Sequence, residues 1–175
     1  KDVFQPKKVL DLGCGPGALM HLLWELGVDV EGVDFAESSK QLATKEVRDR
    51  ITVGDVGDPT LKASLYRAAK ASVLPTSQEN FGFVLFESLA CATPLVTTDL
   101  VDTWRELKEH GGAYIASQDP EAVAREVLRV LNLPAEEHRA IGERARAWVL
   151  EYLDERGIGE KMERAYEAAC AMHAG

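Results

Sequence analysis

Short apolar runs alternate with longer amphipathic stretches along the whole chain, and this pattern predicts strands separated by helices. The apolar runs have the length of buried strands, and several are closed by glycine or aspartate. The expected strands are 9–12, 30–33, 51–53, 72–74, 95–98 and 113–116. The expected helices are 18–26, 38–47, 61–70, 81–91, 103–110, 121–131, 135–153 and 160–171.

Residues at the ends of two expected helices support this assignment. Gly27 follows the first helix at the position where a C-terminal glycine is common. Asp119 followed by Pro120 has the character of an N-cap with proline at the first helical position.

Six short strands separated by helices predict an α/β fold, because parallel strands need helical crossovers between them. We expect residues 1–175 to form one domain with a single doubly wound, Rossmann-like parallel sheet and helices on both faces. The expected strand order is 3-2-1-4-5-6. Ligands of such sheets bind outside the carboxyl ends of the strands, so candidate chemistry is sought there.

Composition and charge narrow the classes of ligand and partner. The chain has 175 residues and a net charge of −9, which disfavours a nucleic-acid partner. No apolar run approaches the roughly 18 residues of a membrane span, and no secretory leader is recognisable. Cys14, Cys91 and Cys170 have neither disulfide nor metal spacing. We expect a cytoplasmic monomer or weak homo-oligomer without metal, which binds a small molecule at most.

Glycines follow the first expected strand and open the first expected helix, in the segment 11–17. Glycine there lets a ligand approach the backbone, and a helix N-terminus offers unpaired N–H groups. Asp34 closes the second strand, where a carboxylate can bind ribose hydroxyls. Tight turns and helix caps need the same residue types, so a purely structural role stays open.

The segment Asp11-x-Gly13-x-Gly15-x-Gly17 resembles the first motif of class I S-adenosylmethionine-dependent methyltransferases, over about residues 7–56. The resemblance implies that the loop wraps the methionine part of S-adenosylmethionine. It also implies that Asp34 binds the ribose and that Asp55, after the third strand, lies near the adenine. The candidate cofactor-binding residues are Asp11, Gly13, Gly15, Gly17, Asp34 and Asp55.

Two carboxylates lie at the helix that follows the fourth expected strand, one in the loop before it and one within it. Glu79 precedes Glu87 by eight residues, which is about 11–12 Å along a helix axis. That separation is too long for an acid–base pair and suits a ligand with several hydroxyl groups. The alternative is that Glu79 stabilises the helix dipole and Glu87 forms a surface pair.

The second part of the chain resembles the C-terminal, nucleotide-sugar-binding domain of retaining GT-B glycosyltransferases, over about residues 61–168. The segments that carry the resemblance are 65–69, 73–77, 79–87, 88–96 and 119–122. It implies that Glu79 faces the donor sugar and that Glu87 binds the nucleotide ribose, with Phe81 and Gly82 between them. Three departures stand out: Ala92 where the family usually has glycine, and residues 100–103 where it usually has a glycine pair. The third is the most serious: the family's first strands, which supply the basic residues that hold the diphosphate, have no counterpart here.

Together these resemblances predict a hybrid chain. Residues 1–58 form a methyltransferase-like half and residues 59–175 a glycosyltransferase-like half, joined near residues 56–60. A chimera made by recombining fragments, and thus a designed protein, is favoured over a natural fusion. We expect a residual S-adenosylmethionine or nucleotide site without turnover, and the catalytic residues stay unassigned. The alternative is a transferase: an S-adenosylmethionine-dependent methyltransferase, or a glycosyltransferase domain that binds a nucleotide sugar, the less favoured ligand.

Overall fold

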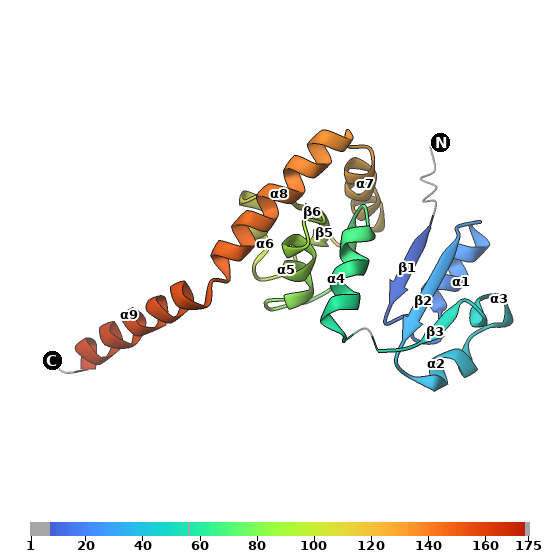
Figure 1. The fold of residues 1–175 in the computed structure, drawn as a ribbon, viewed down its shortest axis with the longest axis horizontal. Coiled ribbons are helices and arrows are strands. Elements are labelled where there is room, and N and C mark those ends of the chain that lie inside the picture. The colour runs from blue at the N-terminus through green and yellow to red at the C-terminus, as the bar shows by residue number, and fades with distance from the viewer. Residues whose placement is uncertain (1–7, 56, 174–175) are drawn as a thin grey trace. The chain divides into compact units, whose positions relative to one another are not determined.

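The computed structural model describes residues 8–55 and 57–173. The chain divides into two compact units, unit 1 up to Ser64 and unit 2 from Leu65 onward. Each unit is built around a three-stranded parallel sheet (Figure 1). The predicted α/β class with parallel strands and helical crossovers is therefore confirmed.

Unit 1 contains the first three strands, in the order β1-β2-β3. Its elements are β1 (Val9–Leu12), α1 (Ala18–Glu25), β2 (Val30–Asp34), α2 (Glu37–Leu42), α3 (Lys45–Arg48) and β3 (Ile51–Val53). Val9 pairs with Val30, and Gly32 in the middle of β2 pairs with Ile51. The core of unit 1 consists of Cys14, Met20, Val30, Ala43, Val47 and Ile51.

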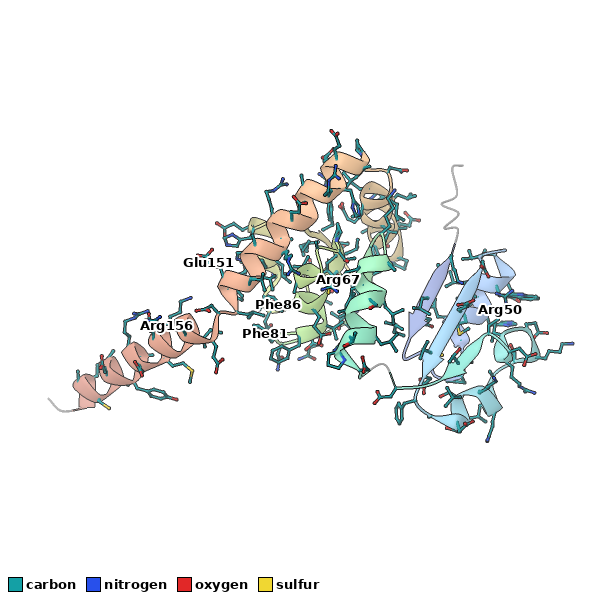
Figure 2. All side chains as sticks on the ribbon, viewed as in Figure 1. Arg50, Arg67, Phe81, Phe86, Glu151 and Arg156 are labelled. Carbon is teal, nitrogen blue, oxygen red and sulfur yellow. The ribbon has the colours of Figure 1, made fainter. Side chains whose placement is uncertain are left out.

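The helix α4 (Pro59–Ala68) leads from unit 1 into unit 2, whose strands follow the order β4-β5-β6. The further elements are β4 (Ser72–Leu74), α5 (Phe83–Ala90), β5 (Leu95–Thr98), α6 (Trp104–Glu109), β6 (Ala113–Ala116), α7 (Pro120–Leu131), α8 (Ala135–Tyr152) and α9 (Glu155–His173). The core consists of Leu85, Phe86, Leu89, Leu95, Val101, Leu107, Ala113, Ala145 and Val149. Phe81 stacks on Phe86 with their ring centroids 4.4 Å apart (Figure 2).

Within unit 1 the strands pair in the order β1-β2-β3, and within unit 2 in the order β4-β5-β6, which agrees with the 3-2-1 and 4-5-6 parts of the expected strand order. One expected helix is divided. The helix expected over residues 38–47 is split into α2 and α3, because Ala43 and Thr44 are extended. The Thr44 hydroxyl forms a hydrogen bond of 3.1 Å with Nδ1 of His21 on α1, a contact across the unit that holds the break.

The ends of α1 and α5 share one backbone motif but differ in the residue that closes it. After α1, Gly27 has φ +78°, and the N–H groups of Gly27 and Val28 donate to carbonyls of the last helical turn. After α5, Ala92 has φ +60°, and the N–H groups of Ala92 and Thr93 donate in the same way. This is the Schellman motif, which favours glycine at the left-handed position. Ala92 is the one non-glycine residue with positive φ among the residues described.

Replacing Ala92 by glycine is expected to stabilise unit 2. The left-handed conformation costs an alanine about 1 kcal/mol relative to glycine, and this cost disappears in Ala92→Gly. Denaturant unfolding should show an increase in the free energy of unfolding of that size. The reciprocal variant Gly27→Ala is the matched control and should lower stability by a similar amount. A destabilised Ala92→Gly would show that the Ala92 methyl group contributes more packing energy than its backbone conformation costs.

The helix α9 differs from the others in its exposure. Every residue from Glu160 to Met172 is exposed, including the large apolar residues Met162 and Tyr166. None of the helices described is both long and apolar enough to cross a membrane.

Candidate functional site

The glycine loop of unit 1 has the left-handed backbone that its sequence predicts. Gly13, Gly15 and Gly17 have φ values of +74°, +52° and +75°. A Cβ added at Gly13 or Gly15 would meet no atom within 4 Å, so one side of the loop is open. The N–H of Gly13 donates to the Val33 carbonyl at 2.8 Å, and that of Gly17 to the Cys14 carbonyl at 3.0 Å. Both of these N–H groups are therefore used to build the loop.

Asp34 binds the loop to the end of β2. Its Oδ2 accepts a hydrogen bond from the N–H of Gly15 at 2.9 Å. Its Oδ1 accepts from the N–H of Ala36 and from the hydroxyl of Ser39, each at 2.9 Å. The side chain is nearly buried, and the hydrogen bonds from Ala36, Gly15 and Ser39 hold the pKa of Asp34 below its ordinary value. This arrangement supports the turn-and-cap interpretation of Asp34.

The two other acidic candidates of unit 1 are placed differently from Asp34, although burial raises the pKa of the Cys14 thiol and Asp11 and Asp34 both lie close enough to add to that increase. Asp11 is partly buried on β1, and burial raises the pKa of its carboxyl group. Asp55 is exposed, and its Oδ1 accepts a hydrogen bond from the N–H of Gly57 at 2.6 Å. Asp55 therefore closes a local Asx turn after β3.

In unit 2, threonines connect the ends of β4 and β5 at the edge where a ligand is expected. The Thr97 hydroxyl donates to the Leu74 carbonyl at 2.9 Å, and the Thr98 hydroxyl donates to the Thr76 carbonyl at 2.7 Å. Thr97 and Thr98 are fully buried. The segment that leaves β4 is thus held against the end of β5.

Glu79 is positioned by its backbone. Its N–H donates to the Leu100 carbonyl at 3.2 Å, and its carbonyl accepts from the N–H of Asp102 at 3.0 Å. The two bonds form an isolated parallel bridge between Glu79 and Val101. The Val101 side chain is buried in the core of unit 2. The segment with the first carboxylate is therefore joined to the segment between β5 and α6.

The helix α5 begins at Phe83, two residues later than expected, and its N-cap is Gly82 with φ +67°. No side chain caps this N-terminus, so Glu79 is not the cap and lies outside the helix. The helical spacing predicted between Glu79 and Glu87 therefore does not apply. The positive φ favours glycine at this position, and an added Cβ would also lie 2.8 Å from Cγ of the Glu79 side chain.

Glu87 lies within α5, close to Tyr66 of α4. Burial raises the pKa of Tyr66 to about 12, and the Glu87 carboxylate adds to the increase. The Tyr66 hydroxyl donates to the Val84 carbonyl at 3.4 Å. Glu79 and Glu87 thus belong to one unit, one before α5 and one in its second turn.

A pocket of about 360 Å³ lies at the carboxyl ends of β4 and β5. The sequence prediction includes none of the residues that line it. Asp99 directly follows β5, so a strict search of strand ends would have found it, whereas nothing in the pattern marks Arg105. The lining residues are Ser77, Gln78, Asp99, Leu100, Val101, Asp102, Trp104 and Arg105.

No cluster of three metal-ligating side chains occurs within residues 8–55 and 57–173. The three cysteines are all free.

Residues 22–148 match the family described as glycosyl transferases group 1. Among curated proteins, a D-inositol 3-phosphate glycosyltransferase from Segniliparus rotundus is 32% identical over 73% of this chain and 28% of its own length. The N-acetyl-alpha-D-glucosaminyl L-malate synthase from Bacillus anthracis is 29% identical over 78% of this chain and 35% of its own length. The chain thus spans about a third of these relatives.

Solved structures of glycosyltransferases share the fold. A sucrose-phosphate synthase from Thermosynechococcus elongatus superposes with a TM-score of 0.66 at 20% identity, over 95% of this chain and 46% of that one. A glycosyltransferase from Rickettsia africae superposes with a TM-score of 0.66 at 16% identity, over 95% of this chain and 49% of that one.

These findings confirm the glycosyltransferase resemblance and extend it. The family match begins at residue 22, upstream of the expected boundary near residue 61, and runs through the expected junction at residues 56–60. They favour the glycosyltransferase alternative over the S-adenosylmethionine-binding scaffold. The methyltransferase resemblance, the hybrid origin and the assigned site residues stay predictions.

Proposed function

Because the chain belongs to the group 1 glycosyl transferases, we propose that unit 2 binds the nucleotide-sugar donor of such an enzyme. In this proposal Glu79 contacts the donor sugar, Glu87 binds the ribose, and Phe81 and Gly82 shape the turn between them. In this proposal, such a domain forms part of a retaining glycosyltransferase.

The observation that carries the proposal is the bridge between Glu79 and Val101. It joins the backbone of Glu79 to the segment after β5, next to Gln78 and Asp102 of the pocket lining, at the strand ends where ligands of parallel α/β sheets bind. The following turn leads through Gly82 to the N-terminus of α5, which has no side-chain cap. The free N–H groups of a helix N-terminus attract phosphate, and this one lies next to the proposed donor site.

The relatives suggest the chemical class of the reaction. Their names describe glycosyl transfer to D-inositol 3-phosphate and the synthesis of a glucosaminyl malate. For this chain we propose only the binding of the nucleotide-sugar donor of such reactions. Acceptor binding and transfer would require parts of the fold that the relatives have outside the matched third of their length.

Titration of the full chain with uridine diphosphate tests the proposal. We expect binding, and we expect Glu87→Gln to weaken it by about tenfold or more, because a carboxylate accepts stronger hydrogen bonds from ribose hydroxyls than an amide does. Calorimetry measures both affinities.

Glu151→Gln is the matched control for Glu87→Gln, because Glu151 is exposed near the end of α8 (Figure 2). It should bind uridine diphosphate as the unchanged chain does. A folded chain that binds no uridine diphosphate, or a Glu87→Gln variant with undiminished affinity, would refute the proposal.

We keep S-adenosylmethionine binding in unit 1 as a second proposal. It is supported by the open side of the glycine loop at Gly13 and Gly15, where a ligand can approach the backbone. Against it, Asp34 already accepts three hydrogen bonds from the protein, so the ribose would need another partner. Titration of the full chain with S-adenosylhomocysteine tests it, and the absence of binding would exclude it.

A further inference from the structure

The pocket beside Glu79 presents charged groups that make no hydrogen bond or ion pair with the residues described. The carboxylates of Asp99 and Asp102 and the guanidinium of Arg105 form no hydrogen bond or ion pair there. The guanidinium carbon of Arg105 lies 4.7 Å from the centre of the Trp104 ring. Such a contact restricts the arginine while leaving its N–H groups available.

The backbone that presents these side chains is fixed at several points. The N–H of Asp99 donates to the Ala116 carbonyl at 3.0 Å, which extends the pairing of β5 with β6. The N–H of Asp102 donates to the Glu79 carbonyl at 3.0 Å. A pocket with a fixed backbone loses little conformational entropy when a ligand binds.

The charges of the pocket indicate the class of ligand. Two carboxylates and one guanidinium give the charged lining an excess of negative charge, which disfavours a phosphate group. A neutral polyhydroxylated molecule fits better, because each hydroxyl group can both donate and accept a hydrogen bond. Asp99 and Asp102 would accept, and Arg105 and Gln78 would donate. The volume of about 360 Å³ is within the range of small-molecule pockets, about 300–1,000 Å³.

We infer that this pocket holds a pyranosyl ring and that Asp102 and Arg105 determine which sugar is accepted. The inference deepens the proposed function, on which it rests for identifying that ring as the sugar of the donor. Asp102 connects the pocket with the proposed donor site, because its backbone N–H donates to the Glu79 carbonyl while its side chain lines the pocket. Trp104 acts as a positioning residue that holds the Arg105 guanidinium.

The indole N–H signal of Trp104 in an NMR spectrum reports binding in this pocket directly. The full chain is titrated with the methyl glycosides of glucose, galactose, mannose and N-acetylglucosamine, up to tens of millimolar. We expect at least one glycoside to shift the signal. We expect Asp102→Ala to weaken that response by about tenfold or to abolish it, because a charged hydrogen-bond acceptor is lost.

Asp49→Ala, an exposed aspartate in unit 1, is the matched control and should leave the response unchanged. The inference is overturned if no glycoside shifts the Trp104 signal, if Asp102→Ala responds like the unchanged chain, or if inorganic phosphate gives the larger shift. Uridine diphosphate titrated into the same samples separates the two proposals. Binding of uridine diphosphate without any glycoside response refutes only this inference, whereas the reverse result refutes only the proposed donor site.

Discussion

Gly142→Ala is expected to destabilise unit 2 by about 3 kcal/mol or more, because the added methyl group has no space. Its Cβ would lie 2.2 Å from the carbonyl oxygen of Ala92 and 3.0 Å from the carbonyl carbon. Both atoms belong to the backbone of the turn that ends α5, so no flexible side chain can move aside. The helix α8 packs against α5, and Arg146, one turn after Gly142, donates to the Ala90 carbonyl. Accommodating the methyl group would therefore separate the two helices.

Denaturant unfolding measures this effect, and Gly159→Ala is its matched control. Gly159 also lies within a helix, but a Cβ there would meet no atom within 4 Å. That variant should be neutral or more stable by up to about 1 kcal/mol, because alanine favours helix. Combining Gly142→Ala with Ala92→Gly should not restore stability, since the clash is with a carbonyl group. Unchanged stability of Gly142→Ala would mean that α8 does not rest on this turn.

Asp34→Ala is expected to destabilise unit 1 severely, a structural role that differs from the ribose contact implied by the methyltransferase resemblance. The substitution removes the acceptor of three hydrogen bonds and leaves the N–H groups of Gly15 and Ala36 without it. Amide hydrogen exchange should show faster exchange at Gly15 and Ala36, by roughly tenfold or more. Asp49→Ala, with an exposed carboxylate in the same unit, should leave both amides protected. If the amides of Gly15 and Ala36 stay protected in Asp34→Ala, the Asp34 hydrogen bonds do not stabilise the loop, and its glycines alone account for its stability.

The same carboxylate predicts how the stability of unit 1 depends on pH. Hydrogen bonds from Ala36, Gly15 and Ser39 hold the pKa of Asp34 below its value in an unfolded chain. Its contribution is therefore fully present above about pH 4 and is lost as the pH falls through the lowered pKa of the folded state. In acid titrations, the exchange rates of unchanged unit 1 should approach those of Asp34→Ala.

The sequence predicted correctly those elements whose position depends only on residues close together in the chain. All six strands lie within one residue of their expected bounds, because short apolar runs ended by turn residues describe buried strands. Asp119 forms the expected N-cap, accepting from the N–H of Ala122 at 2.8 Å. The left-handed backbone at Ala92 explains why glycine is usual at that position in the family that the chain resembles.

Features that depend on contacts between distant residues could not be predicted in this way. At the break between α2 and α3, Thr44 forms a hydrogen bond with His21, 23 residues earlier, a contact that no local pattern indicates. The position of Glu79 depends on an isolated bridge to Val101, which leaves no periodic pattern in the sequence. The pocket residues were missed because Asp102 lies in the turn after β5 and Arg105 in the first turn of α6, beyond the strand end where ligand contacts were sought.

Because α9 is exposed, its helical conformation depends mainly on interactions within the helix. From Glu160 to Met172 every residue is exposed, so hydrophobic burial contributes little to holding the segment in place. Isolated helices of this length are marginal in water, and α9 is supported by pairs such as Arg156 with Glu160, whose charged atoms lie 3.4 Å apart. The segment is therefore expected to undergo helix–coil transitions within about a microsecond. During such openings a trypsin-like protease would reach Lys161 and Arg164 while the remainder of unit 2 stays folded.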